Sequence, residues 1–360
     1  MNGRNASTAV GCIRIAVLND YSMTEALRLV KQGQYPAHHT WGASHFERLG
    51  SKAIVPAFRG AGLWGSLRTQ IQVYWRQREI DVVYAACQSE TWLLARLRYL
   101  GLFRCPIVAV IHHPIQGRLR GGRMFVKGHD RLLFLSQRAC EDALDDWPDV
   151  KRQSEVISWG VDLDFYDQQD HWPHPYGQAY FVSAGKANRD HQTLVDCAGA
   201  GQHKTLIVCS ADTRPSVIDA DWVTVVGDRS GHALTYGQLT SVYRSARAIV
   251  IPLAHVVGLA GLTSLLDAIA CGRPVIMTRN ALIDVDIEAL GFGVWVPVGD
   301  REALGQAMRR LADDDELVTA MGAKARAFAE QQYRYETFSK QVLAHCANAL
   351  RVAKPVMEHG

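Results

Sequence analysis

The sequence predicts an α/β protein built from two doubly wound domains. Short apolar segments alternate with amphipathic segments from end to end, which is typical of parallel sheets covered by helices. A chain of 360 residues is long enough to bury two cores. Residues 164–177 are rich in Asp, Gln, His and Pro. We therefore predict an amino-terminal domain over residues 1–163, a linker over 164–177 and a carboxy-terminal domain over 178–332.

Eleven apolar segments predict the strands of the two sheets. The first sheet would use residues 13–19, 82–86, 107–111, 132–136 and 155–158. The second would use residues 180–184, 205–210, 223–226, 248–252, 274–277 and 294–297. One helix is predicted over 300–312 behind an Asp cap, and another from Glu316. The carboxyl ends of parallel strands meet at one edge of a sheet, so we expect the ligand site in the cleft there.

Composition excludes several classes of protein. The net charge of +3 is too small to indicate nucleic-acid binding. No run of eighteen apolar residues predicts a transmembrane helix. The first residues lack the apolar core that is typical of a signal peptide. The eight cysteines form no CxxC pair, and several lie inside apolar runs. This pattern is typical of reduced thiols and argues against a zinc site. We therefore expect a cytoplasmic protein. If it contacts a membrane, we expect the contact at the inner face.

Residues 261–276, GLTSLLDAIACGRPVI, combine a helix start, an acid one turn later and a helix stop. Gly261 allows close backbone approach, and Thr263 or Ser264 can cap the helix. Open amides at a helix start favour phosphate, and Asp267 would lie where a ribose follows. The alternative is that Ser264 and Asp267 form only a capping box.

This segment and four others, in the same order, resemble the nucleotide-sugar half of the retaining family-four GT-B glycosyltransferases. The others are residues 154–166 (SEVISWGVDLDFY), 180–201 (YFVSAGKANRDHQTLVDCAGAG), 239–253 (LTSVYRSARAIVIPL) and the run GFGVWVPVGDREALGQAMRRLADD from Gly291. The resemblance covers about residues 154–345. It implies the GT-B fold, in which two Rossmann-like domains face each other across a cleft. It also implies that the last helix, about residues 333–360, packs back on the first domain.

The resemblance further implies an enzyme that moves a sugar from a nucleoside-diphosphate-sugar to an acceptor hydroxyl, with retention at the anomeric carbon. Such a reaction belongs to polysaccharide or glycoconjugate synthesis and needs no cofactor. Two other functions stay open: a catalytically silent homologue that serves as a binding or scaffold subunit, and a nucleotide-sugar epimerase. No Asp-x-Asp pair lies at a donor position in the sequence, so we expect no metal.

Two cations follow the segment YFVSAG directly. Gly185 would make the tight turn, and Lys186 and Arg189 would stand at the cleft rim. Cations there stabilise the charge that concentrates on a leaving diphosphate, so we assign both a catalytic role. The family usually has an Arg followed by a more distant Lys, whereas this chain has Gly-Lys-Ala-Asn-Arg-Asp. The alternative is a pair of solvated loop residues.

Asp267 matches the second acid of the family's paired-glutamate motif, which implies a clamp on the ribose hydroxyls of the donor. The first acid, which usually contacts the transferred sugar, is replaced by Leu259. Backbone amides of Gly261, Leu262 and Thr263 can replace its contacts.

Two histidine pairs are further candidates. His112 and His113 end an apolar strand, and neighbours in an extended chain point to opposite sides, so at most one faces the cleft. The family usually has one histidine here, and we choose His112 as catalytic over a purely structural role. His39, beside His38, is the next candidate and would bind substrate.

Positive charge gathers between Arg96 and Arg131, where eight basic residues face the single acid Asp130 and apolar residues interleave. Such a surface suits an anionic bilayer or a lipid-linked or otherwise anionic acceptor, and it predicts peripheral membrane contact. The alternative is that these residues decorate ordinary helices and a loop. The basic residues are Arg96, Arg98, Arg104, Arg118, Arg120, Arg123, Lys127 and Arg131.

Overall fold

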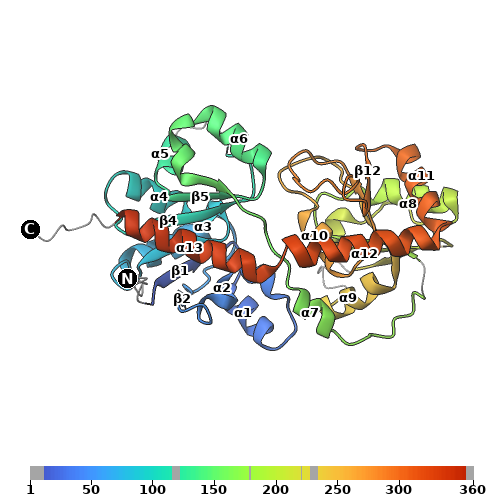
Figure 1. Ribbon diagram of the computed structural model, residues 1–360, viewed down its shortest axis with the longest axis horizontal. Helices are drawn as coiled ribbons and strands as arrows, with labels where there is room; N and C mark the ends of the chain where they lie inside the picture. Colours follow the sequence, from blue (N-terminus) through green and yellow to red (C-terminus); the bar gives the residue numbers. More distant parts are fainter. Residues whose placement is uncertain (1–11, 116–121, 178–179, 220, 228–233, 354–360) are drawn as a thin grey trace, which may run out of the picture.

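The protein folds into two lobes, each with a six-stranded parallel sheet between helices (Figure 1). The computed structural model describes residues 12–115, 122–177, 180–219, 221–227 and 234–353. The strand order is β2-β1-β3-β4-β5-β6 in the first lobe and β12-β11-β10-β7-β8-β9 in the second, and every strand pair is parallel. The predicted fold class is confirmed.

The first lobe contains one strand that the sequence analysis missed. Strand β2 has only three residues, Lys52–Ile54, which is too short for an alternating pattern to stand out. The other strands of this sheet are β1 (Arg14–Leu18), β3 (Val82–Ala85), β4 (Ile107–Ile111), β5 (Arg131–Phe134) and β6 (Ser154–Val156). The helices are α1 (Met23–Lys31), α2 (Ala43–Phe46), α3 (Gly62–Trp75), α4 (Trp92–Tyr99), α5 (Gly122–Lys127) and α6 (Gln137–Asp146), with short 3₁₀ turns η1 (Ala37–Thr40), η2 (Gln88–Thr91) and η3 (Pro148–Gln153).

All six strands predicted for the second lobe are present, with ends that differ by one or two residues. They are β7 (Tyr180–Gly185), β8 (Thr205–Cys209), β9 (Val223–Val226), β10 (Ala246–Ile251), β11 (Val275–Thr278) and β12 (Gly293–Val296). The helices are α8 (His191–Gly201), α9 (Tyr236–Ser245), α10 (Leu262–Ala270), α11 (Arg301–Ala312) and α12 (Asp315–Gln332), with the 3₁₀ turn η4 (Ala211–Thr213). The Asp300 side chain accepts from the Ala303 amide and caps α11, as predicted.

The chain crosses between the lobes twice. The first crossing contains the short helix α7 (Leu163–Gln168), capped by Asp162, within the stretch predicted as linker. The second leads into α13 (Tyr335–Ala353), which packs on β3, β4 and α2 of the first lobe and runs across the front of Figure 1 in red. The crossings touch through a bridge between Val161 and Arg334. A Cβ on Gly160 would stand 2.4 Å from the Arg334 carbonyl oxygen, so glycine is required there.

Each sheet reverses its strand order once, between β1 and β3 in the first lobe and between β7 and β10 in the second. Loops that leave neighbouring strands at such a point run in opposite directions, and the crevice between them is where ligands bind in doubly wound sheets. In the second lobe the loops are residues 186–190 and 252–261. The fold therefore predicts a ligand site between the segments that carry Arg189 and the start of α10.

Candidate active site

Arg189 lies at the switch point of the second sheet, on the loop after β7. Its Nη2 donates to Ser264 Oγ at 2.9 Å and its Nη1 to the Ala187 carbonyl at 3.1 Å. Among the described residues, its buried Nε has no hydrogen-bond partner and its guanidinium makes no ion pair with an acid. Desolvation lowers the pKa of Arg189 from its ordinary value. A desolvated cation that lacks an acid is suited to an anionic ligand.

The start of α10 lies directly beside this guanidinium. Its N-cap is Gly261, with φ of 92° and no capping side chain, and a Cβ there would stand 2.3 Å from Met277 Cε. The expectation that Thr263 or Ser264 caps the helix is therefore wrong, and the alternative capping box does not form. Ser264 instead donates to the Ala184 carbonyl at 3.2 Å and accepts from Arg189.

One of the three amides predicted to be open at this helix start, that of Leu262, is paired. The Leu262 amide donates to the Leu259 carbonyl at 3.1 Å and is not free. The amides of Thr263 and Ser264 have no acceptor among the residues that the structure describes. Two orphan amides and the positive end of the helix dipole thus face the same side as Arg189, which is the usual arrangement of a phosphate site.

Gly185 makes room for Arg189. A Cβ on Gly185 would stand 2.5 Å from Arg189 Nε, so the missing side chain lets the arginine fold back over the end of β7. The Lys186 side chain is exposed, and the Lys186 carbonyl accepts from Ser210 Oγ at 2.8 Å. Of the two predicted cations, the structure brings Arg189 to the helix start and leaves Lys186 on the solvent side of the same turn.

Asp267 is buried one turn into α10, with a partner that the sequence did not predict. Tyr166 of α7 donates its hydroxyl to Asp267 Oδ1 at 2.5 Å. Burial raises the pKa of Asp267 to about 7, and the tyrosine hydrogen bond opposes this rise. The carboxylate that we predict as a ribose clamp is therefore held at the lobe interface by the chain segment that connects the lobes.

Two neutral histidines of the first lobe lie against Asp267. His38 and His39 each offer a ring nitrogen, and these atoms and a carboxylate oxygen of Asp267 all lie within 4.8 Å of one another. The Nε2 atoms of both rings are buried and have no hydrogen-bond partner among the described residues. Burial lowers the pKa of His39 to about 4 and that of His38 well below its ordinary range. The structure thus brings His39 and Asp267, predicted separately, to one interface.

His112 is half-buried at the end of β4. Its Nε2 donates to the Ala86 carbonyl, and its ring packs edge-on against Trp41, with centroids 4.4 Å apart. Burial lowers the pKa of His112 to about 4, so the ring is neutral and Nδ1 keeps its lone pair. His113 is exposed and faces the second lobe, since a Cβ on Gly258 would stand 2.5 Å from its Nδ1. The catalytic role of His112 stays a prediction.

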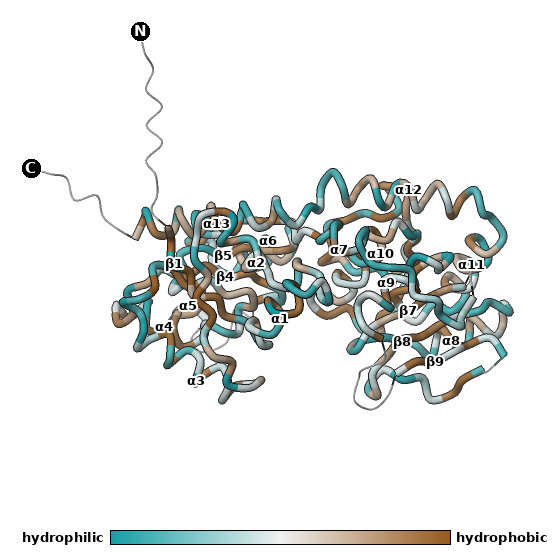
Figure 2. The backbone as a smooth tube through the Cα atoms, turned by 90° about the horizontal axis from the view of Figure 1, so that it is seen from below, coloured by the Kyte–Doolittle hydropathy of each residue, from teal (hydrophilic) through white to brown (hydrophobic). Residues whose placement is uncertain are grey.

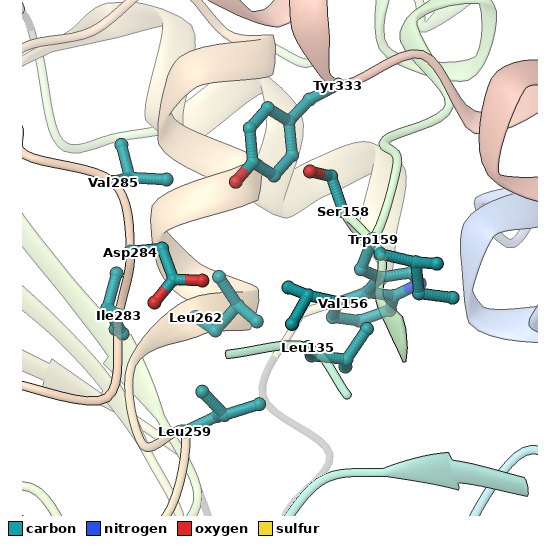
Figure 3. Close-up of a pocket in the computed structure, with 11 residues that line it drawn as sticks. Leu135, Val156, Ser158, Trp159, Leu259, Leu262, Ile283, Asp284, Val285 and Tyr333 are labelled. Atoms are coloured by element: carbon teal, nitrogen blue, oxygen red, sulfur yellow. The ribbon is translucent and has the colours of Figure 1, made fainter. Parts of the chain in front are cut away.

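A cavity of about 50 Å³ lies between the lobes (Figure 3). Leu259, which stands where the resemblance places the first acid, lines this cavity together with apolar side chains of the first lobe such as Leu135 and Val156. At Asp284, which lines the cavity, the backbone N–H of Gln137 in the first lobe donates to Asp284 Oδ2 of the second lobe at 2.7 Å. The cavity is smaller than the several hundred Å³ of ordinary ligand pockets, and Arg189, Ser264 and Asp267 do not line it.

The basic segment is less positive in the structure than in the sequence. Arg98 pairs with Asp130 at 2.6 Å, and Lys127 pairs with Asp149, an acid outside the segment. The guanidinium of Arg96 lies over the Trp92 ring. Two members fall outside the described residues, Arg118 and Arg120. The described part therefore presents fewer free charges than a count along the chain suggests.

Residues 172–314, which contain Arg189 and α10, match the family described as glycosyl transferases group 1. The chain therefore has the GT-B fold, and most of its second lobe matches the model of this family. Three solved structures share the GT-B fold of this protein over nearly its full length. A comparison with curated protein sequences gave no match.

These three structures differ from the GT-B protein in sequence. Trehalose 6-phosphate synthase from Burkholderia multivorans is 12% identical, with TM-score 0.71, and covers 96% of this chain and 100% of its own. Sucrose-phosphate synthase from Thermosynechococcus elongatus is 16% identical, with TM-score 0.67 and coverage of 95% and 100%. HepE from Anabaena, in complex with UDP and glucose, is 14% identical, with TM-score 0.64 and coverage of 93% and 100%. At these identities the likeness establishes the fold alone.

Proposed function

We propose that the protein transfers a sugar from a nucleoside-diphosphate-sugar to an acceptor hydroxyl, with retention at the anomeric carbon. The observation that carries this proposal is Arg189, a desolvated guanidinium without an acid partner beside two orphan amides of α10. The donor diphosphate would bind there. Its negative charge grows as the sugar leaves, so a fixed cation and a helix dipole lower the barrier. Retention is carried over from the family resemblance.

Binding of the donor would require two side chains of the proposed site to change partners. Asp267 would exchange the Tyr166 hydroxyl for the ribose hydroxyls, and Lys186 would turn from solvent toward the diphosphate. HepE was solved with UDP, with UDP and glucose, and with UDP-glucose, so UDP is the first nucleotide to test.

A second candidate is a catalytically silent homologue that acts as a binding or scaffold subunit. Two observations favour it: Leu259 replaces the first acid and lines an apolar cavity, and Asp267 is already paired with Tyr166. A protein in which Asp267 stays bound to Tyr166 would bind a donor weakly and transfer nothing.

Nucleotide binding and donor turnover separate the two candidates. At a hundred times its dissociation constant a ligand stabilises the folded protein by about 2.7 kcal/mol, so one of UDP, GDP, dTDP and ADP should raise the melting temperature. An enzyme should also release nucleotide slowly from the matching sugar donor without acceptor. Stabilisation without any release over long incubation would favour the silent homologue, and no stabilisation by any nucleotide would contradict both donor-binding roles.

We expect activity to be independent of divalent metal. The diphosphate charge would be met by Arg189, Lys186 and the helix dipole. The His38, His39 and Asp267 group is unsuited to a metal in this arrangement, because the Asp162 amide donates to His38 Nδ1 at 3.3 Å and so leaves the proton on Nε2, which then cannot be a ligand. Turnover should survive EDTA. Loss of activity in EDTA with recovery in Mg²⁺ or Mn²⁺ would contradict this prediction.

A further inference from the structure

Helix α3 presents an apolar stripe to solvent. Trp64, Arg68, Ile71 and Trp75 recur at helical spacing on its outer face, and all four side chains are exposed. Trp64 is 72% exposed and Trp75 is 77% exposed, among the highest values for large apolar side chains in the described residues. Tryptophan is usually well buried in folded proteins. Two exposed tryptophans on one face of one helix therefore require an explanation, and we refer to these four residues as the α3 stripe.

The inner face of α3 is firmly fixed, so the exposure is not a consequence of loose packing. Val73 is buried against the core of the first lobe. Gln70 is fully buried, and its Oε1 accepts from the amides of Leu93 and Leu94 at 2.8 and 3.2 Å. The helix is thus held on the start of α4 and turns the α3 stripe outward.

A second exposed apolar segment lies beside the end of α3. Leu100 and Leu102, just after α4, are both exposed. The Arg104 amide donates to Gln77 Oε1 at 3.2 Å, which places this segment beside the end of α3. Figure 2 shows α3 and α4 together at the margin of the first lobe. With 14 residues, α3 is about 21 Å long, so the surface is large enough to lie flat on another surface.

The charge around the α3 stripe is mostly positive. Residues 58–79 contain four arginines and one acid, Glu79. Arg76 pairs with Glu79, while three others near the surface make no ion pair with a described residue: Arg59, Arg68 and Arg78. Tryptophan prefers the boundary between headgroups and acyl chains, and arginine reaches from there to lipid phosphate. Anionic phospholipid complements both features.

We propose that the α3 stripe docks the protein onto the surface of an anionic phospholipid bilayer. The helix would lie in the plane of the interface, with its two tryptophans inserted and its arginines on the phosphates. No helix in the described part of the chain could cross a bilayer. This inference goes beyond the proposed function and does not rest on it. It also moves the main membrane contact from the basic segment Arg96–Arg131 to α3.

A second copy of the chain is a poorer partner for this surface. In a two-fold symmetric pair, each copy would present the same surface to the other. Arg68, in the middle of the stripe, and Arg78, beyond its end, would then approach their own counterparts, and the one acid in residues 58–79, Glu79, already pairs with Arg76. Lipid phosphate removes that repulsion, and a copy of the chain does not.

The double variant Trp64→Ser/Trp75→Ser tests the proposal. Wild-type protein should sediment with phosphatidylcholine vesicles that contain phosphatidylglycerol, less at high salt, and weakly with phosphatidylcholine alone. The double variant should lose at least about tenfold in partition coefficient, because each inserted tryptophan contributes apolar burial. Both side chains are exposed, so the variant should fold normally, and its release of nucleotide from a donor should match that of wild type.

A matched control removes equally exposed apolar side chains elsewhere. Val217 and Val352 are 66% and 67% exposed, and Val217→Ser/Val352→Ser should bind vesicles like wild type. Wild-type protein that ignores anionic vesicles at low salt would overturn the proposal, as would a tryptophan variant that still binds them fully. A dimer in analytical ultracentrifugation that the tryptophan variant dissociates, without vesicle binding, would assign the surface to self-association instead.

Discussion

Replacing Arg189 by alanine is expected to lower turnover by roughly 10²- to 10³-fold while the fold stays intact. The guanidinium is fixed before the donor arrives, by Ser264 at 2.9 Å and by the Ala187 carbonyl at 3.1 Å. A cation fixed in this way needs no rearrangement as charge develops on the leaving diphosphate. Steady-state kinetics with the donor found in the nucleotide screen measure the loss, and circular dichroism checks the fold.

Three further variants make this result specific. Arg189→Lys keeps the charge but cannot reach Ser264 with the same planar fork, so we expect partial activity. Lys186→Ala should also lose roughly 10²-fold if Lys186 turns toward the diphosphate. Arg214→Ala is the control, since this arginine of the same lobe is exposed and, within the described part of the chain, its side chain bonds only the Gly227 carbonyl. Wild-type turnover in both the Arg189 and Lys186 variants would exclude the diphosphate assignment.

The contact between Arg189 and α10 could be anticipated from the sequence because it depends on strand order. The two segments follow strands that become neighbours in a doubly wound sheet, and loops at the carboxyl ends of such strands converge. The helix cap could not be anticipated in the same way. Ser264 is a good capping residue by type, but Gly261 takes the cap because Met277, on the next strand, fills the space that any Cβ would need.

The contacts of Asp267 could not be predicted from the sequence, for a different reason. Tyr166 lies 101 positions before it, and His38 belongs to the other lobe. Such contacts depend on how two separately folded lobes meet, which leaves no periodic pattern in the chain. The only local sign was that Tyr166 lies within VDLDFY, one of the segments that carry the family resemblance.

The α3 stripe was missed because an amphipathic pattern predicts a buried apolar face, and here the apolar face is outside.

Replacing Asp267 by asparagine is expected to stabilise the free protein at alkaline pH. Burial raises the pKa of Asp267 from its ordinary value of 3.8 to about 7, so the folded state binds the proton more tightly than the unfolded state. Stability therefore falls as pH rises from about 4 to about 7, and above that the full cost of the buried charge is present. At about 1.4 kcal/mol per unit of pKa, this cost reaches up to roughly 4 kcal/mol.

Thermal unfolding of both proteins between pH 5 and pH 8.5, about the range in which the carboxyl titrates, measures this effect. Asp267→Asn carries no charge at any of these values, so its melting temperature should exceed that of wild type by an amount that grows with pH. Asp212→Asn, at an exposed acid of the same lobe, should give no such divergence. A difference between Asp267→Asn and wild type that does not change with pH would mean that the carboxylate is not desolvated in solution.

The same substitution should weaken nucleotide binding, and the combination of the two effects is the informative result. A carboxylate accepts from both hydroxyls of a ribose, whereas an amide offers one acceptor and a donor. Calorimetric titration should therefore give Asp267→Asn a lower affinity, and a 2′-deoxy nucleotide should lose its disadvantage in the variant. Unchanged affinity would remove the ribose role. Higher stability with lower affinity would identify Asp267 as a buried charge that is retained for its ligand, at the expense of the stability of the free protein.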